Sequence, residues 1–204
     1  ELVSHYTYGI VSDGDLMEGV AAEAASLAGH LGLGRLIYLY DDNRISIEGS
    51  TELAFTEDVS ARFAAYGWQV LVVEDGNDLA AIAAAIEQAR AEQQRPSLIR
   101  ERTHIGYGSP KQDDPAAHGE PLGEEAVAVA KRNLGWPLEP TFLVPAQVAQ
   151  HLGQARARGA AAQAEWRERL ERARAAEPER VALFERVMAG ELPEGWQEAL
   201  PRFA

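Results

Sequence analysis

The feature that most constrains this fold is a regular alternation of short apolar runs with alanine-rich helical stretches between residues 5 and 102. The apolar runs are YTYGIV (6–11), RLIYLYDDN (35–43), WQVLVVED (68–75) and PSLIRERT (96–103). The stretches between them, 16–33, 57–67 and 77–93, have helical spacing and good helix formers. Strands that are continuously apolar are typical of a parallel sheet buried on both faces. We therefore predict an α/β fold, with a parallel sheet covered by helices on both faces.

Composition narrows the class of protein. The 204 residues include no Cys, which excludes disulfides and thiolate metal sites, and a net charge of −13 argues against a nucleic-acid surface. No apolar run approaches the roughly 20 residues needed to cross a bilayer, so we expect no membrane span and a cytoplasmic location. Because the chain opens on Glu1 without a signal-like segment, we expect it to be part of a longer protein.

Two further tracts follow the alternating region. Residues 104–123 are crowded with Gly and Pro and predict a long loop of the kind that often carries function. Residues 124–204 are strongly helical, with breaks at 137–145 and at Pro178. We predict a domain over 1–136, incomplete at its N-terminus, and a helical linker tract over 137–204. Within the first domain, Thr56 with Glu57 and Asp58 is expected to precede one helix and Asn77 to cap another.

Acidic residues stand where the first apolar run, IVSDGDLMEG, gives way to a helix expected from about Leu16. Asp13 follows the strand end, and Gly14 allows the backbone to approach a ligand closely. The N–H groups of a helix start suit a phosphate, and a phosphate beside a carboxylate needs a cation such as Mg²⁺ between them. The second run ends in Asp41, Asp42 and Asn43 at the same predicted edge. For each residue alone, capping or a turn is the commoner explanation.

The spacing of these residues resembles a known signature. Asp13-Gly14 is followed 30 positions later, 43 minus 13, by Asn43, which resembles the thiamine-diphosphate motif. The pieces DGDLMEG, GLGRLIYLYDDNRISIEGST, FAAYGW, IGYGSP and HGEPLG together resemble the transketolase family over most of residues 5–136. One departure is Ser12, which occupies the position of the motif's first glycine.

The resemblance implies a set of cofactor and metal contacts. Mg²⁺, or Ca²⁺, would be held by Asp13, the side-chain oxygen of Asn43 and the backbone carbonyl of Ile45, with diphosphate oxygens and water completing an octahedron. Further contacts to thiamine diphosphate would come from the backbone of Gly14, from Ile47 against the thiazolium, and from His118, which would also reach the reacting part of the substrate.

Glu18 and the remaining histidines have separate interpretations. In the family, the glutamate that matches Glu18 lies near the dimer interface, whereas a helix-start acid is the simpler explanation; Asp15 is expected to be only a helix-start acid. His104 adjoins the Gly-rich loop and could line the site. The other histidines, His5, His30 and His151, are expected to be structural.

The implied function is transfer of a two-carbon ketol unit between ketose and aldose sugar phosphates, in the pentose phosphate pathway, by a homodimer. The family's cofactor-activating glutamate and several substrate histidines are not in this sequence, so the 204 residues alone are expected to be inactive. Two alternatives stay open. One is another thiamine-diphosphate enzyme such as dihydroxyacetone synthase, and the other is a non-catalytic acidic interaction domain.

Overall fold

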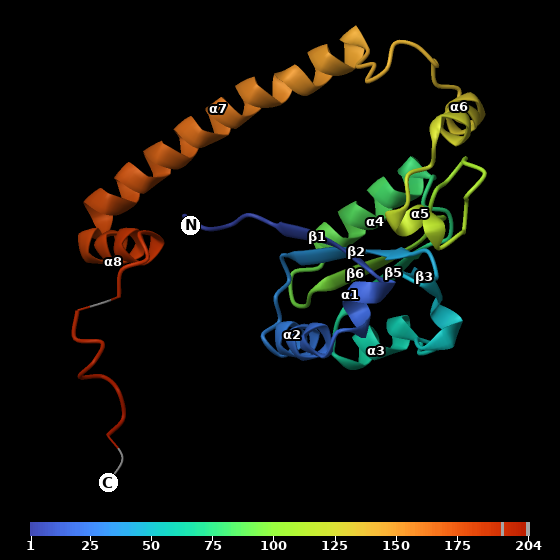
Figure 1. Cartoon of the computed structure of the whole chain (residues 1–204). Coiled ribbons are helices and arrows are strands. Elements are labelled where there is room, and N and C mark those ends of the chain that lie inside the picture. The colour runs from blue at the N-terminus through green and yellow to red at the C-terminus, as the bar shows by residue number, and fades with distance from the viewer. Residues whose placement is uncertain (193, 203–204) are drawn as a thin grey trace. The chain divides into compact units, whose positions relative to one another are not determined.

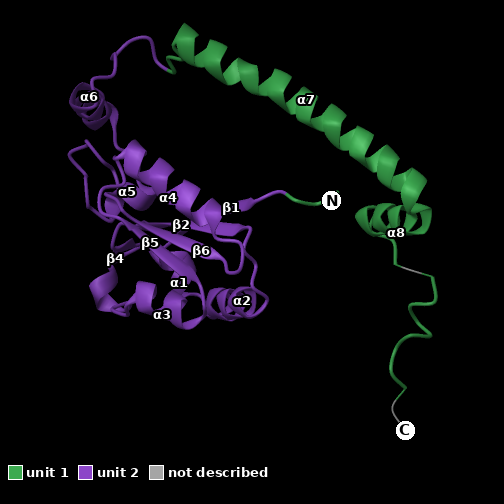
Figure 2. Ribbon diagram, turned by 180° about the vertical axis from the view of Figure 1, so that it is seen from behind, with its two compact units in different colours: residues 1–4, 142–204 green, residues 5–141 purple. Residues whose placement is uncertain are grey.

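The computed structural model describes residues 1–192 and 194–202. The chain divides into two compact units, one made of residues 5–141 and the other of residues 1–4 with 142–204 (Figure 2). The first unit contains the alternating strands and helices, and the second contains the helical tail. Each unit is described by itself below.

A parallel sheet forms the centre of the unit 5–141. Its strands are β1 (Thr7–Ser12), β2 (Leu36–Asp42), β6 (Ser97–Arg102) and β5 (Gln69–Val73), which lie in the order β1-β2-β6-β5. Every neighbouring pair is parallel. Three of these strands fall within the apolar runs predicted from sequence, and β1 extends one residue beyond its run, to Ser12. The register aligns Ser12 with Asp41 and Asp41 with Glu101, so the polar ends of three strands lie side by side.

Helices cover both faces of this sheet, which confirms the predicted α/β class (Figure 1). One face packs against α1 (Asp13–Met17), α2 (Gly19–His30) and α3 (Val59–Ala65). The opposite face packs against α4 (Leu79–Ala91). Burial of apolar side chains on both sides leaves the strand ends as the place where polar groups can gather.

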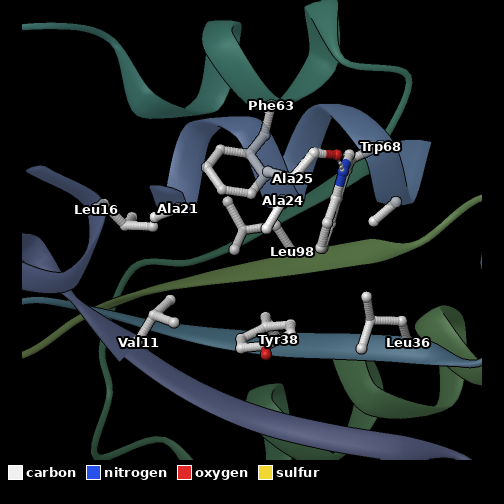
Figure 3. A pocket seen from close by; sticks show the side chains of 11 residues that line it. Val11, Leu16, Ala21, Ala24, Ala25, Leu36, Tyr38, Phe63, Trp68 and Leu98 are labelled. Carbon is white, nitrogen blue, oxygen red and sulfur yellow. Dashed lines mark hydrogen bonds between the residues drawn. The ribbon is translucent and has the colours of Figure 1, made fainter. Parts of the chain in front are cut away.

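The larger core lies beneath α2. Figure 3 shows Phe63 and Trp68 packed above Leu98 and beside a partly open apolar cavity of about 150 Å³. The two aromatic rings meet edge to face with centroids 5.1 Å apart. The Trp68 indole N–H donates a hydrogen bond to the carbonyl oxygen of Ala25 at 2.8 Å, which fixes α2 against the turn between α3 and β5.

Two details of the helix starts differ from the sequence prediction. The first helix begins at Asp13 rather than near Leu16, and Glu18 separates it from α2. The predicted cap at Asn77 is wrong, because the carboxylate of Asp78 accepts the N–H groups of Ala80 and Ala81 at 3.0 Å each. An Asp in this position accepts two N–H groups with one oxygen.

The predicted start of α3 agrees with the structure, and so does the predicted role of Asp15 at the start of α1. Asp58 caps α3 by accepting the N–H of Ala61 at 3.0 Å. The Asp15 carboxylate accepts both the N–H of Ser12, at 2.9 Å, and its hydroxyl, at 3.1 Å. Asp15 is therefore a helix-start acid, and the Ser in place of glycine helps to cap the turn.

Short elements surround the strand ends. Strands β3 (Ile45–Ser46) and β4 (Gly49–Ser50) form a small antiparallel hairpin, followed by a 3₁₀ helix, η1 (Thr51–Leu53). The Gly- and Pro-rich stretch 104–123 is mostly turns, with a short helix, α5 (Ala116–Gly119), that carries His118. Helix α6 (Glu124–Asn133) follows.

The unit made of residues 1–4 and 142–204 contains α7 (Ala146–Ala176) and α8 (Pro178–Met188). The Trp166 indole N–H donates to the carbonyl of Leu2 at 2.9 Å, and Arg174 pairs with Glu185 between the two helices. The predicted helical character and the break at Pro178 are confirmed. Within residues 1–192 and 194–202, no helix combines the length and apolarity that crossing a membrane requires.

Candidate functional site

Asp13 is a buried carboxylate at the junction of β1 and α1. Only 2% of the surface of Asp13 is exposed, and both oxygen atoms of its carboxylate accept hydrogen bonds. The Tyr40 hydroxyl donates to Oδ1 at 2.5 Å, and the backbone N–H of Arg44 donates to Oδ2 at 3.0 Å. Burial raises the pKa of the Asp13 carboxyl above its ordinary value, and the Tyr40 hydrogen bond opposes that rise. A neighbouring cation would favour the charged form in the same way.

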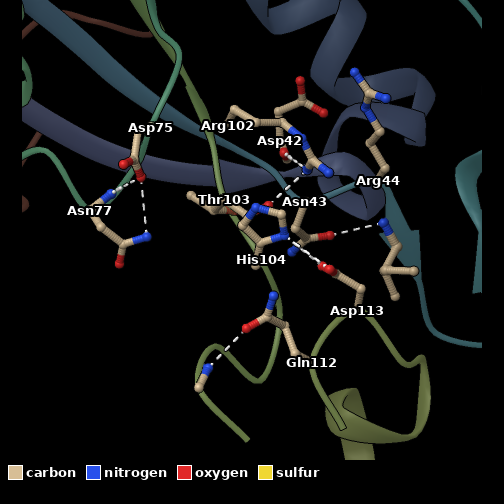
Figure 4. Close-up of polar contacts among 12 residues, drawn as sticks. Asp42, Asn43, Arg44, Asp75, Asn77, Arg102, Thr103, His104, Gln112 and Asp113 are labelled. Atoms are coloured by element: carbon tan, nitrogen blue, oxygen red, sulfur yellow. Dashed lines mark hydrogen bonds and ion pairs between the residues drawn. The ribbon is translucent and has the colours of Figure 1, made fainter. Parts of the chain in front are cut away.

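The turn after β2 supplies the second group of oxygen atoms. Arg44 has φ of +62°, a left-handed conformation that only glycine adopts without strain. The Asn43 side-chain oxygen accepts the N–H of Ile45 at 2.9 Å (Figure 4). Its amide nitrogen donates to Asp41 at 3.4 Å, so these contacts fix which side of the amide carries the oxygen. Asp41 in turn accepts a hydrogen bond from the Thr103 hydroxyl.

A hollow of about 410 Å³ lies at the carboxyl edge of the sheet. Asn43 and His118 both line it, together with Asp41, Glu101 and His104. The Nδ1 atom of His104 lies 2.9 Å from the carboxylate of Asp113, which orients the imidazole (Figure 4). His104 therefore does line this hollow, as its place beside the Gly-rich loop suggested.

Glu101 is an unusual member of this hollow. Its Oε1 atom is buried and has no hydrogen-bond partner among the residues that the structure describes. Burial, followed by the nearby charge of Asp41, raises the pKa of the Glu101 carboxyl. The Glu101 carboxyl therefore keeps its proton to a higher pH than a solvent-exposed glutamate does.

A second polar hollow, of about 440 Å³, lies beside the start of α1, directly after β1. Asp13, Tyr40 and Arg44 line it with Asp42 and Arg100. The guanidinium of Arg100 pairs with the buried carboxylate of Asp42 at 2.7 Å. Asp13 and Asn43 thus line different hollows, and the backbone of Arg44 connects them.

The other predicted residues lie around this centre. A Cβ atom added to Gly14 would meet no heavy atom within 4 Å, so a ligand could approach its backbone. Ile47 is 67% exposed on the turn between β3 and β4. Glu18 lies on the surface as the residue that precedes α2, where its carbonyl accepts the N–H of Ala21 at 3.1 Å. The structure therefore brings Asp13 to the 43–45 turn and Asn43 to His118, and it leaves Ile47 and Glu18 at the surface.

The donor set fits a hard divalent cation. Among residues 1–192 and 194–202, no cluster of three or more His, Cys, Asp or Glu side chains could hold a metal. The predicted set is of another kind, because it combines one carboxylate with an amide oxygen and a backbone carbonyl. Such oxygen ligands suit Mg²⁺ when phosphate oxygens and water supply the rest of the coordination. The open space at Gly14 is compatible with a diphosphate beside it.

Comparison with known proteins decides the family. The family model described as transketolase, thiamine diphosphate binding domain, matches residues 1–193. The chain belongs to the transketolase family. The transketolase of Nostoc sp. PCC 7120 is 51% identical over 205 residues, covering 100% of this chain and 30% of that protein. That of Geobacillus stearothermophilus is 50% identical over 203 residues, covering 98% and 30%.

Solved transketolases have the same fold. The transketolase from Leishmania mexicana superposes with a TM-score of 0.90 at 42% identity, covering 100% of this chain and 30% of that one. The Pichia stipitis transketolase in complex with sedoheptulose-7-phosphate gives 0.89 at 44% identity, with the same coverage. This chain thus spans about 30% of the length of the transketolases it matches.

Sequence reasoning missed two groups that contact Asp13. Tyr40 lies in an apolar strand and is indistinguishable by pattern from a core aromatic residue. Its place two residues before Asp42, on the same face of β2, was the available signal. The contact of the Arg44 backbone amide could not be predicted, because no pattern of composition or spacing indicates an arginine with a left-handed backbone conformation.

Proposed function

We propose that this chain is the thiamine-diphosphate-binding part of a transketolase that transfers a two-carbon ketol unit between ketose and aldose sugar phosphates. The observation that carries the proposal is the buried Asp13 carboxylate beside the 43–45 turn, at the carboxyl edge of a parallel sheet. Ligands bind at this edge in open α/β sheets. Membership of the family favours this function over another thiamine-diphosphate enzyme or a non-catalytic interaction domain.

The proposed metal ligands are the Asp13 carboxylate, the side-chain oxygen of Asn43 and the backbone carbonyl of Ile45. They would hold Mg²⁺, or Ca²⁺ in its place, and the ion would neutralise both the buried carboxylate and the diphosphate. The backbone of Gly14, at the start of α1, would contact the diphosphate.

His118 and Ile47 have proposed roles nearer the reaction. His118 shares a hollow with Asn43, so its imidazole would donate to the diphosphate and to oxygens of the substrate. Ile47, exposed at the hairpin turn, would pack against the thiazolium ring, which excludes water from it. When bound, thiamine diphosphate supplies the carbon nucleophile that takes up and hands on the two-carbon unit.

We also propose a homodimer, with Glu18 near the interface. Glu18 directly precedes α2, whose outer face exposes Val20 and Leu27, and Leu31 follows at the C-terminal end of the helix, also exposed. Sedimentation should show a weaker dimer for Glu18→Gln than for Glu125→Gln, a control at an exposed position of α6 and away from α2. Equal dimer dissociation constants for the two variants would remove Glu18 from the interface.

The helices after residue 136 are proposed as a linker toward a further domain, because this chain spans about 30% of its relatives. Activity would then require the rest of the protein. The location proposed from sequence is cytoplasmic, although the maize relative is a chloroplastic transketolase.

The direct test is a two-carbon transfer assay on the full-length protein. Ketose phosphates are the donors of choice, since the Pichia stipitis enzyme was solved with fructose-6-phosphate, xylulose-5-phosphate and sedoheptulose-7-phosphate. We expect transfer from xylulose 5-phosphate to an aldose phosphate only when thiamine diphosphate and Mg²⁺ are both present. A folded protein that binds both and transfers nothing to any aldose phosphate would contradict the proposal.

A further inference from the structure

Tyr40 is a buried phenol whose hydroxyl is committed to one partner. The residue is 3% exposed, near the carboxyl end of β2, and its hydroxyl lies 2.5 Å from Oδ1 of Asp13. The two residues are 27 positions apart in sequence and lie on different elements. The contact is therefore a product of the tertiary fold, and it joins β2 to the start of α1.

The second oxygen of Asp13 is also held. The backbone N–H of Arg44 donates to Oδ2 at 3.0 Å, and the left-handed conformation of Arg44 accompanies this contact. A carboxylate has about four acceptor sites, so one hydrogen bond on each oxygen leaves lone pairs for a metal ion. Two donors from different elements restrict the rotation of the carboxylate about its side chain, which lowers the entropy cost of coordinating a cation.

We propose that Tyr40 is a positioning residue, whose hydroxyl, together with the Arg44 amide, sets the orientation in which Asp13 coordinates Mg²⁺. The inference rests on the proposed function, because it needs Asp13 to be a metal ligand. Outer groups that hydrogen-bond a metal ligand commonly change metal affinity by about 10- to 100-fold when they are removed.

The same strand offers a matched comparison. Tyr38 lies two residues earlier on the same face of β2 and packs against Trp68, with ring centroids 6.2 Å apart. Among the described residues, no hydrogen bond of the Tyr38 hydroxyl is found. Removing the Tyr38 hydroxyl therefore deletes the same kind of group from the same face of β2 as removing the Tyr40 hydroxyl, but it leaves the hydrogen bonds of Asp13 in place.

The experiment measures the Mg²⁺ concentration that gives half-maximal binding of thiamine diphosphate to the full-length protein, by calorimetry. Tyr40→Phe keeps the ring and removes only the hydroxyl, so we expect the half-saturating Mg²⁺ concentration to rise at least about tenfold. Tyr38→Phe should leave it unchanged. Replacing Tyr40 with 4-aminophenylalanine restores a donor at the same ring position and should recover most of the affinity.

Melting temperatures without metal separate positioning from simple packing. A role confined to stability predicts that Tyr40→Phe melts lower but needs the same Mg²⁺ as the parent, and that result would overturn the inference. The inference would also be overturned if the aminophenylalanine variant folded normally but did not recover Mg²⁺ affinity.

If Tyr40→Phe does not fold, the aminophenylalanine variant tests the inference by itself. The same Mg²⁺ dependence in that variant as in the parent supports the role of the donor at the para position of the ring. A parent protein that binds thiamine diphosphate without Mg²⁺ would overturn the proposed metal site itself, and this inference with it.

Discussion

Glu101 has a buried carboxylate oxygen without a hydrogen-bond partner among the described residues. Its pKa is raised in the folded chain, by burial and then by Asp41, above the ordinary value of 4.5. Between those two pKa values the folded state binds more protons than the unfolded state, so stability falls as pH rises through this range. Above the folded-state pKa the loss of stability is complete and constant.

The corresponding prediction concerns Glu101→Gln. The amide cannot ionise, so the variant should gain stability over the parent as pH rises from about 4.5, and the difference should then level off. Urea denaturation of the α/β unit at a series of pH values measures the difference. Glu48→Gln, at an exposed turn position, is the control for which we expect no such gain. A stability difference for Glu101→Gln that is independent of pH would contradict the assignment.

Single residues also show where the sequence was sufficient. The position of Asp13 and Asn43 at the carboxyl edge of the sheet was predictable, because each lies at the end of an apolar strand and parallel strands end at one edge. The contacts that surround them were not predictable, since Tyr40 and Arg44 meet Asp13 only through the tertiary fold. The sequence likewise gave no reason to place His104 opposite Asp113.

At the level of elements, α2 depends on a close approach to the end of α3. A Cβ atom added to Gly29 would lie 1.8 Å from the carbonyl oxygen of Tyr66, whereas one added to Gly19 would meet nothing within 4 Å. Both glycines belong to the same helix. Gly29 is therefore required for packing, and Gly19 is not.

This pair gives a prediction with its own control. Gly29→Ala should lower the free energy of unfolding by about 1–3 kcal/mol, because the backbone of Tyr66 must move. Gly19→Ala should be neutral or should raise it by about 0.5 kcal/mol, through helix propensity. Chemical denaturation of both variants measures the contrast. Equal effects of the two substitutions would mean that α2 does not approach α3 as described.

Elements were predicted better than their ends. The four strands were predictable from the continuous apolar runs, because few structures other than a sheet covered on both faces bury such runs. The break at Glu18 was missed because Met17 and Glu18 are good helix formers, so only the backbone at residue 18, with ψ of 133°, reveals it. Asn77 and Asp78 are both acceptable caps, and the choice between them depends on the loop geometry before α4.

Across the whole α/β unit, the stretch 104–123 is a long segment in which α5 is the one regular element among the described residues. It consists of turns and the short helix α5; its described backbone hydrogen bonds are local, such as Asp113 N–H to the Ile105 carbonyl at 2.9 Å, and the Asn133 side chain on α6 donates to the Gly108 carbonyl at 2.7 Å. Thiamine diphosphate and Mg²⁺ would add partners to it. Hydrogen exchange over residues 106–122 should therefore slow on cofactor binding.

His118 should affect turnover more than cofactor affinity, because Asp13 and Gly14 would hold most of the diphosphate. Losing one donor to charge that develops in the transition state costs about 3 kcal/mol, so His118→Ala should lower turnover by roughly 10²-fold. Its cofactor affinity, measured by calorimetry, should change much less. Parental turnover in His118→Ala, with equal exchange of 106–122 with and without cofactor, would leave His118 as an ordinary loop residue.

The central claim is that the buried Asp13 carboxylate holds the cation that binds thiamine diphosphate. The most direct test is calorimetric titration of the full-length protein with thiamine diphosphate, with and without Mg²⁺. Asp75→Asn provides the control, since Asp75 follows β5 at the same edge of the sheet but is exposed, and its hydrogen bonds to described residues stay within its own turn. We predict Mg²⁺-dependent binding in the parent and in Asp75→Asn, and its loss in a folded Asp13→Asn. Unchanged, Mg²⁺-dependent affinity in Asp13→Asn would contradict the account.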